Sequence, residues 1–148
     1  MTDLGKTIVL DEQALQLIRL FSSFTGAMVK DCVVISESRV VFVIARRDLG
    51  TAIGRGGSNI KTLKEKLNRE IDVVEYSADV ERFIRNLMSP AKVQTIEFQR
   101  KGNRKVAVVF VAPSEKGIAI GKGGRNIIKA KILVKRHFDV DDLVVASR

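Results

Sequence analysis

The sequence predicts an α+β fold made of two similar small domains in tandem. The segment AIGRGGSNI at residues 52–60 returns as AIGKGGRNI at residues 119–127, with seven of nine residues identical at an offset of 67. Helical and strand-like patterns follow one another in the same order around both copies, as expected for a duplicated unit. The 148 residues, 45% of them apolar, are enough for two units that each bury a core.

The first unit is predicted in the order αββααβ. Apolar residues recur at helical spacing from Leu10 to Phe21, with Asp11 as the expected N-cap and Gly26 as the stop. Two runs rich in Val and Ile then flank a short polar turn, which is typical of a hairpin. The expected elements after the first helix are strands 28–36 and 39–45, a short helix 48–53, a helix 58–69 and a strand 71–75.

The second unit repeats this order. Pro113 should end the second strand, because proline lacks the N–H that a ladder needs. At the offset of 67, Asp72 and Val73 match Asp139 and Val140, which extends the repeat towards the last strand. The expected elements are a helix 79–88, strands 92–98 and 104–112 around a turn at 101–103, a short helix 114–120, a long helix 124–137 and a strand 140–145.

The boundary between the units is expected at Tyr76, which gives a first domain 1–76 and a second domain 77–148. Only Ser77 and Ala78 remain as a linker before the next helix. Such a linker is too short for free tumbling, so we expect two domains in a fixed relation that present one extended surface.

Charge predicts an anionic partner. The formal net charge is +9 and the pI is about 10.0; residues 1–76 contribute +1 and residues 77–148 contribute +8. A single cysteine excludes an intramolecular disulfide. The first residues do not have the basic segment followed by an apolar segment that is typical of a secretory signal peptide, and the sequence has no long apolar run. We therefore expect a cytoplasmic protein with no membrane span.

The repeated glycine segment has the chemistry of a phosphate-binding element. Three glycines in four residues let another backbone approach closely, at 54–57 and again at 121–124. A helix should begin directly after each, and its first N–H groups attract anions. Arg55 and Lys122 add a cation at the tip, and residues 49–64 and 116–138 contain no acid.

Nucleotide-binding loops fit these segments poorly. A Walker A loop requires G-x-x-x-x-G-K-[ST], whereas Gly117 and Gly121 are separated by three residues and Lys122 is followed by Gly123. The dinucleotide-binding motif G-x-G-x-x-G directly follows a strand, whereas a short helix is predicted before both glycine segments. The two motifs therefore favour another kind of phosphate contact.

A G-x-x-G loop between two helices, with Ile before it and Ile shortly after it, resembles the KH domain. Two copies in the order αββααβ resemble the prokaryotic (type II) form and cover nearly the whole chain. This resemblance implies that each loop clamps the backbone of about four nucleotides of single-stranded RNA. The RNA-binding residues it implies are Ile53, Gly54, Arg55, Gly56, Gly57, Ser58, Asn59, Ile60, Lys61 and Lys64, and Ile120, Gly121, Lys122, Gly123, Gly124, Arg125, Asn126, Ile127, Lys129 and Lys131.

Two nearly fused KH units with nothing appended resemble the archaeal NusA-like transcription termination/antitermination factors. Bacterial NusA is similar in its tandem KH part but also has a polymerase-binding domain and an oligonucleotide-binding barrel. The resemblance implies an RNA-binding regulator of transcription elongation and termination, expected as a monomer, and leaves contact with RNA polymerase open. Alternatives are a KH factor in ribosome biogenesis or translation, and a scaffold that uses the KH surfaces for protein only.

The remaining polar residues predict neither catalysis nor a metal or other cofactor. A single histidine, His137, at an expected helix end and a single cysteine, Cys32, in an apolar strand form no metal cluster, and no nucleophile and base stand out. Low aromatic content, 5%, argues against stacking platforms. The basic hairpin turn is interpreted as a solvated turn, with an auxiliary contact to RNA or polymerase as the alternative; its cations are Arg100, Lys101, Arg104 and Lys105.

Overall fold

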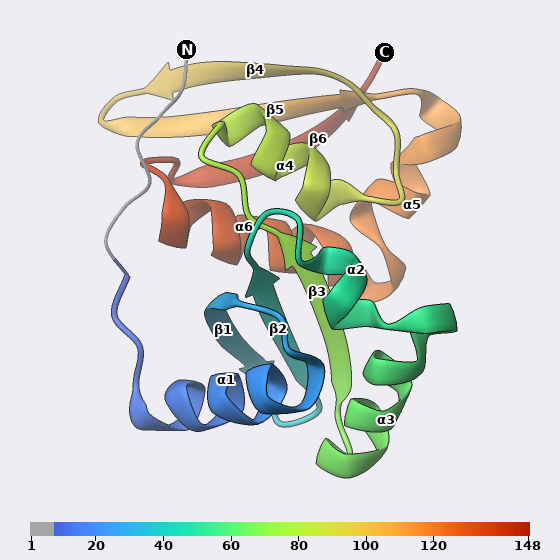
Figure 1. Ribbon diagram of the computed structural model, residues 1–148. Helices are drawn as coiled ribbons and strands as arrows, with labels where there is room; N and C mark the ends of the chain where they lie inside the picture. Colours follow the sequence, from blue (N-terminus) through green and yellow to red (C-terminus); the bar gives the residue numbers. More distant parts are fainter. Residues whose placement is uncertain (1–7) are drawn as a thin grey trace. The chain divides into compact units, whose positions relative to one another are not determined.

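The computed structural model describes residues 8–148, and the chain forms two compact units. The N-terminal unit spans Val9–Tyr76 and the C-terminal unit contains Ser77–Arg148. Both follow the order αββααβ, with a short 3-10 turn between the last two helices (Figure 1). The predicted α+β class and this order are confirmed, while residues 1–7 of the expected first domain lie outside the described residues.

In the N-terminal unit the predicted start and stop of the first helix are both confirmed. The Asp11 side chain accepts a hydrogen bond from the Ala14 N–H at 2.8 Å, and Gly26 ends the helix in the left-handed region with φ 81°. The elements are α1 (Glu12–Thr25), β1 (Val29–Ser36), β2 (Arg39–Ile44), α2 (Leu49–Ile53), a 3-10 turn (Arg55–Gly57), α3 (Ser58–Leu67) and β3 (Glu70–Glu75).

In the C-terminal unit Pro113 follows β5 directly and starts a 3-10 turn. The predicted short helix is therefore split into this turn and a helix of five residues. The elements are α4 (Val80–Met88), β4 (Val93–Lys101), β5 (Arg104–Val111), a 3-10 turn (Pro113–Glu115), α5 (Lys116–Ile120), a 3-10 turn (Lys122–Gly124), α6 (Arg125–His137) and β6 (Asp142–Ser147).

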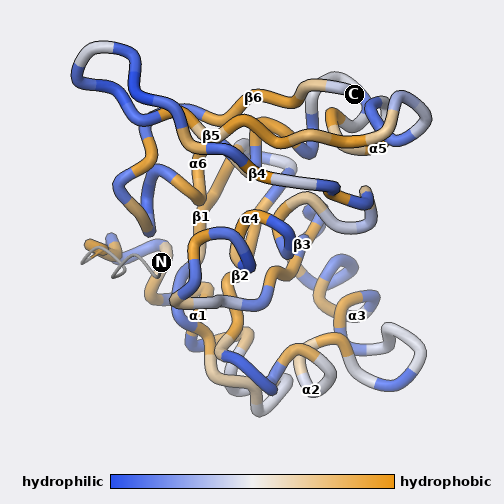
Figure 2. The backbone as a smooth tube through the Cα atoms, turned by 90° about the horizontal axis from the view of Figure 1, so that it is seen from above, coloured by the Kyte–Doolittle hydropathy of each residue, from blue (hydrophilic) through white to orange (hydrophobic). Residues whose placement is uncertain are grey.

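The sheet topology determines where the glycine segments lie. Each unit has a three-stranded sheet, ordered β1-β2-β3 or β4-β5-β6, whose first pair is antiparallel and whose second pair is parallel. A parallel pair needs a crossover connection, which here consists of two helices with the glycine segment between them. The central strands are apolar, and Figure 2 shows most of β5 and β6 in the hydrophobic colour. The duplicated topology therefore places both glycine segments at the same point of their units.

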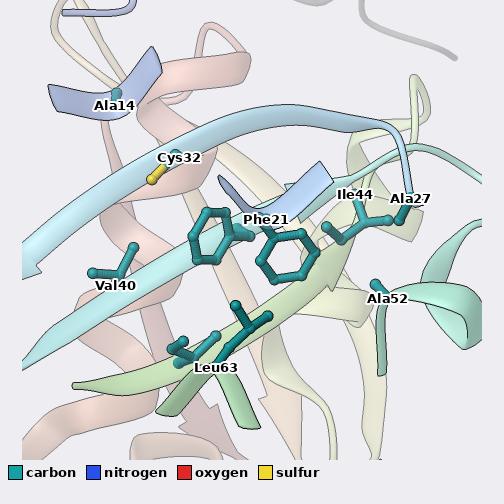
Figure 3. Close-up of a cluster of buried hydrophobic side chains, with 10 residues drawn as sticks. Ala14, Phe21, Ala27, Cys32, Val40, Ile44, Ala52 and Leu63 are labelled. Carbon is teal, nitrogen blue, oxygen red and sulfur yellow. The ribbon is translucent and has the colours of Figure 1, made fainter. Parts of the chain in front are cut away.

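The core of the N-terminal unit lies between α1, α3 and the sheet. The rings of Phe21 and Phe42 have centroids 4.3 Å apart, and Figure 3 shows Phe21 among Ile44, Leu63 and Cys32. Cys32 is 3% exposed, which confirms its predicted place in the core. In aggregate this buried apolar surface supplies the main favourable free energy of folding for the unit.

The core of the C-terminal unit is built on one face of α4. Five of its nine residues are buried, and Phe83 packs against Phe138 with ring centroids 5.5 Å apart. His137 lies in the last turn of α6, as predicted, and its buried ring meets Phe83 edge-on at 5.5 Å.

Two predicted strands in this unit have wrong boundaries, β4 at its end and β6 at both ends. Strand β4 continues to Lys101 instead of ending at Phe98, because the turn needs only two residues. Strand β6 begins at Asp142 rather than at Val140. Val140 is 1% exposed and packs in the core ahead of the strand, which explains why it resembled a strand residue.

The constant offset of 67 does not extend to the last strands. Arg39 pairs with Glu70 in the N-terminal unit, whereas Val106, at the offset of 67 from Arg39, pairs with Asp142. The last strands are thus related by an offset of 72, so the sequence match of residues 72–73 to residues 139–140 is not a structural equivalence. The reason is that α6 has 13 residues and α3 has 10, and a longer turn follows α6.

Candidate nucleic-acid interface

The first glycine of each segment has a conformation that only glycine adopts readily. Gly54 has φ 79° and ψ 168°, and Gly121 has φ 79° and ψ 162°. A Cβ on Gly54 would lie 2.9 Å from the Asn59 nitrogen, and one on Gly121 would lie 2.8 Å from the Asn126 nitrogen. Each glycine is therefore needed for both its backbone angles and the close approach of the following helix.

The next two glycines of each segment turn the chain into that helix through the left-handed region. Gly56 and Gly57 have φ 61° and 77°, and Gly123 and Gly124 have φ 65° and 77°. A Cβ on Gly56, Gly57 or Gly123 would meet nothing within 4 Å, so these positions need glycine for backbone angles alone. The two segments share one geometry, which accounts for their near-identical sequences.

Hydrogen bonds leave the start of each turn open. The Gly57 N–H donates to the Gly54 carbonyl at 3.1 Å, and the Gly124 N–H donates to the Gly121 carbonyl at 3.0 Å. The N–H groups of residues 55–56 and 122–123 precede these bonds and stand at the N-terminal end of the turn, where a helix has no internal acceptor. No acidic residue lies in the first turn of α3 or α6, so the positive end of each helix faces no carboxylate of its own.

The asparagines of the motif brace the loop. The Asn59 amide donates to the Thr51 carbonyl at 2.9 Å, and the Asn126 amide donates to the carbonyls of Ala119 at 3.2 Å and Met88 at 3.1 Å. Asn126 thereby ties α6 to the ends of α5 and α4. Both were predicted as RNA-binding residues, and these bonds give them a structural role that the sequence pattern did not reveal.

The isoleucines on either side of the glycines are half-buried. Ile60 packs against the core of the N-terminal unit, and Ile53, Ile120 and Ile127 have the same intermediate exposure. The exposed part of each lies beside the loop, where the resemblance to KH domains implies contact with RNA. Their contact with RNA stays a prediction.

The predicted cations fall into two groups. Arg55 and Lys122 at the loop tips are exposed, as are Lys61 in α3 and Arg125 at the start of α6. The uncharged Ser58 at the start of α3 is exposed as well. Lys64 is paired with Glu70, with Nζ and Oε2 3.3 Å apart, and Lys131 is paired with Asp142, with Nζ and Oδ1 3.4 Å apart. Cations at the tips therefore face solvent, whereas Lys64 and Lys131, about two turns along their helices, already have carboxylate partners.

Lys129 does not belong to the exposed group. It is 7% exposed because it lies on the buried stripe of α6, four residues before Leu133 and beside Ala130. Its predicted contact with RNA is thus at odds with its burial, and we leave it out of the interface.

Asp142 was not singled out by the sequence, yet it organises the charges at the start of β6. Burial acts to raise the pKa of this carboxyl, but the Leu143 N–H, Lys131 and Arg104 outweigh it and hold the pKa below its ordinary value. The side chains of Arg104 and Lys131 are 62% and 44% exposed, so solvent screens both pairs.

In residues 8–148 no group of three or more His, Cys, Asp or Glu side chains could hold a metal ion. None of the helices in that range is long and apolar enough to cross a bilayer.

Comparison with known proteins agrees with this geometry. A family model described as "NusA-like second KH domain" matches residues 80–146, and one described as "KH domain" matches residues 18–81. The chain is 41% identical over 137 residues to the "Probable transcription termination protein NusA" of Halobacterium salinarum, covering 93% of this chain and 97% of the relative. It is 32% identical over 136 residues to the protein of that name in Methanocaldococcus jannaschii, covering 92% and 74%.

A solved structure gives the same result at the level of the fold. The crystal structure of APE1850 superposes with a TM-score of 0.84 at 38% sequence identity, covering 93% of this chain and all of that one. The chain therefore belongs to the family of NusA-like transcription termination proteins, which are built from two KH domains in tandem.

Proposed function

We propose that this protein binds single-stranded RNA through its two G-x-x-G loops and acts in transcription termination. One observation carries the proposal: both units hold three positive-φ glycines, an exposed cation and the open start of a helix in the same arrangement. The relatives named transcription termination proteins support the cellular role, and the antitermination role is proposed with it. The partner is expected to be nascent RNA, bound by a monomer.

Each loop acts as a backbone clamp. The phosphate lies against the N–H groups at the start of the turn. It can approach them closely because the glycines of the loop have no side chains. Arg55 in the first loop and Lys122 in the second add a mobile cation, and the isoleucines offer an apolar floor for the bases. A KH loop of this kind holds about four nucleotides, and its contacts with the phosphates do not depend on the base sequence.

The test replaces the tip of both loops by acidic residues. In the test variant, Arg55, Gly56, Lys122 and Gly123 all become Asp; in the matched control, the same four become Asn. The Asp variant and the Asn control have side chains of the same shape. They also have the same backbone strain, because Asp and Asn both tolerate the left-handed region that Gly56 and Gly123 adopt. They differ only in charge.

Binding is measured by fluorescence anisotropy with a labelled 20-nucleotide RNA of randomised sequence. The Asp variant should lose binding by at least about a hundredfold, and the Asn control should bind more weakly than wild type but far better than the Asp variant. Thermal melts should match between the two. Wild-type affinity in the Asp variant would refute the clamp, and cross-linking in cell extract would then show which partner the protein contacts.

A further inference from the structure

The hairpin of β4 and β5 ends in a strongly basic tip. Arg100 lies opposite Lys105, and Lys101 lies opposite Arg104, with only Gly102 and Asn103 between the strands. We call residues 100–105 the basic ribbon. Four of its six residues are cations, which amounts to half of the net charge of +8 in residues 77–148.

This ribbon extends beyond the rest of its sheet. The pairing of β5 with β6 begins only at Val106 and Asp142, so the basic ribbon has two strands where the sheet has three. In the N-terminal unit β3 already pairs with Arg39, the first residue after the turn.

The duplication shows that the extension is not required by the fold. In the N-terminal unit the last regular pair before the turn is Val34 with Val40. Ala107, at the offset of 67 from Val40, pairs with Phe98 at the equivalent place in the C-terminal unit. Residues 35–39 close the first hairpin and residues 99–106 close the second, which is three residues longer. The shorter hairpin has a turn of Glu37 and Ser38 and no cluster of cations. The same fold thus forms without the basic ribbon.

The register places like charges face to face. Directly opposed residues of an antiparallel pair project to the same face of the sheet, and successive residues alternate between faces. Arg100 and Lys105 therefore share one face, and Lys101 and Arg104 share the other. Opposed like charges destabilise a strand pair, so the ribbon is repulsive on both faces in the free protein.

Within residues 8–148, Arg100 and Lys101 are the cations of the ribbon that carboxylates neutralise least. Among residues 8–148 no ion pair is formed by Arg100 or Lys101, and the nearby carboxylate of Glu97 is bound by Arg148. Arg104 reaches Asp142 only at 3.8 Å, with its side chain 62% exposed. Figure 2 shows the end of this hairpin in the hydrophilic colour.

The base of the ribbon is anchored. Asp141 accepts a hydrogen bond from the Lys105 N–H at 2.8 Å and donates its own N–H to the Lys105 carbonyl at 2.8 Å. The Lys105 ammonium lies 5.0 Å from the centre of the Phe98 ring, which orients it along the strand. The cations are thus held on a defined support.

We propose that the basic ribbon is a second RNA contact, which holds phosphates of the strand beyond the nucleotides gripped by the C-terminal loop. A flexible polyanion can pass around the tip and meet cations on both faces, whereas the acidic surface of a folded protein meets one face. Phosphates also relieve the repulsion between the opposed cations. This inference rests on the proposed RNA binding and adds to it a site outside both loops.

The distance between the two contacts sets a length requirement. The ribbon includes the first residues of β5 and the glycine loop follows the end of that strand. Figure 1 shows the hairpin and α5 at opposite ends of the sheet. Eight residues of β5 span about 25 Å at roughly 3.3 Å per residue. The C-terminal loop already holds about four nucleotides, so an RNA needs several more to reach the ribbon as well.

The experiment compares Arg100→Gln/Lys101→Gln with the control Arg19→Gln/Arg82→Gln in the full chain. The control removes the same net charge from exposed positions on α1 and α4. Affinity is measured with labelled RNAs of randomised sequence, 5 and 20 nucleotides long. The ribbon variant should bind the 20-mer about ten- to thirtyfold more weakly at 0.1 M salt, with a log–log salt slope shallower by about 1.4 for two lost phosphate contacts. It should bind the 5-mer like wild type, as should the control variant with both RNAs.

The ribbon variant should also melt at the same temperature as wild type or slightly higher, because two opposed like-charge pairs are broken. An unchanged affinity and salt slope for the 20-mer, in a variant that melts normally, overturns the proposal and leaves the hairpin as a solvated turn or a protein contact. Failure of the proposed function would give a different result, because the loop variant with Asp would then bind both RNAs with wild-type affinity.

Discussion

At the scale of single residues, the glycines of one motif have different physical roles. Gly54 and Gly121 combine an extended positive-φ conformation with a close approach to the next helix, whereas Gly56 and Gly123 only require the left-handed region. Sequence comparison treats them as equivalent members of one glycine run. Their different surroundings predict different costs of substitution.

Gly121→Ala should lower the free energy of unfolding by roughly 3 kcal/mol, because it adds a clash with the Asn126 backbone to the strain of its φ and ψ. Gly123→Ala should cost only about 1 kcal/mol, since its Cβ meets open space and a left-handed alanine costs about 1–2 kcal/mol. Urea unfolding followed by circular dichroism measures both. Equal losses in the two variants would show that the close approach to Asn126 does not matter.

At the scale of elements, the start of β6 is a charged junction. Asp142 receives a hydrogen bond from the Leu143 N–H and lies near the side chains of Lys131 on α6 and Arg104 on β5. Three elements therefore meet at one carboxylate, and its ionised form is the one that they stabilise. The lowered pKa of Asp142 is the consequence.

Asp142→Asn should destabilise the protein at pH 7 by about 0.5–1 kcal/mol, a modest value because solvent screens both ion pairs. The folded-state pKa lies below the unfolded one, so this stabilisation is present above the unfolded value, near 3.9, and is lost as pH falls through the folded pKa. Unfolding measured from pH 7 to pH 2.5 should show wild type and variant converging at the acidic end. A difference that stays constant over this range would exclude ionisation of Asp142 as its cause.

At the scale of the whole molecule, the two units have one fold and different charge. Residues 1–76 carry a net charge of +1 and residues 77–148 carry +8. The C-terminal loop has Lys122 and Arg125 where the N-terminal loop has Arg55 and Ser58. Because phosphate contacts dominate affinity for nucleic acid, the C-terminal unit should contribute more of the binding.

Acidic replacement of one loop at a time tests this asymmetry. Lys122→Asp/Gly123→Asp should weaken binding of the 20-mer RNA about tenfold more than Arg55→Asp/Gly56→Asp, and should reduce the salt slope by more. Anisotropy titrations between 0.05 and 0.5 M salt provide both quantities. A larger effect of the N-terminal loop would mean that local geometry, not charge, ranks the two clamps.

Much of the architecture followed from the chain itself. The offset of 67 predicted the duplicated αββααβ order, Asp11 and Gly26 predicted the bounds of α1, and the glycine segments predicted the family. These features depend on local spacing and backbone preference, which neighbouring residues determine. The end of β4 and the start of β6 were missed because a turn of two residues and a buried Val140 depend on pairing with distant strands.

Tertiary structure alone decided what the polar residues of the motif do. Asn59 and Asn126 brace the loops, Lys64 and Lys131 have carboxylate partners, and Lys129 is buried. Likewise, only the strand register placed the four cations of the basic ribbon opposite one another. The sequence by itself determined the duplicated fold and the two glycine segments, because both arise from local backbone chemistry. The availability of each charge for RNA was decided by the folded chain, because it depends on which carboxylate, carbonyl or cation lies across from it.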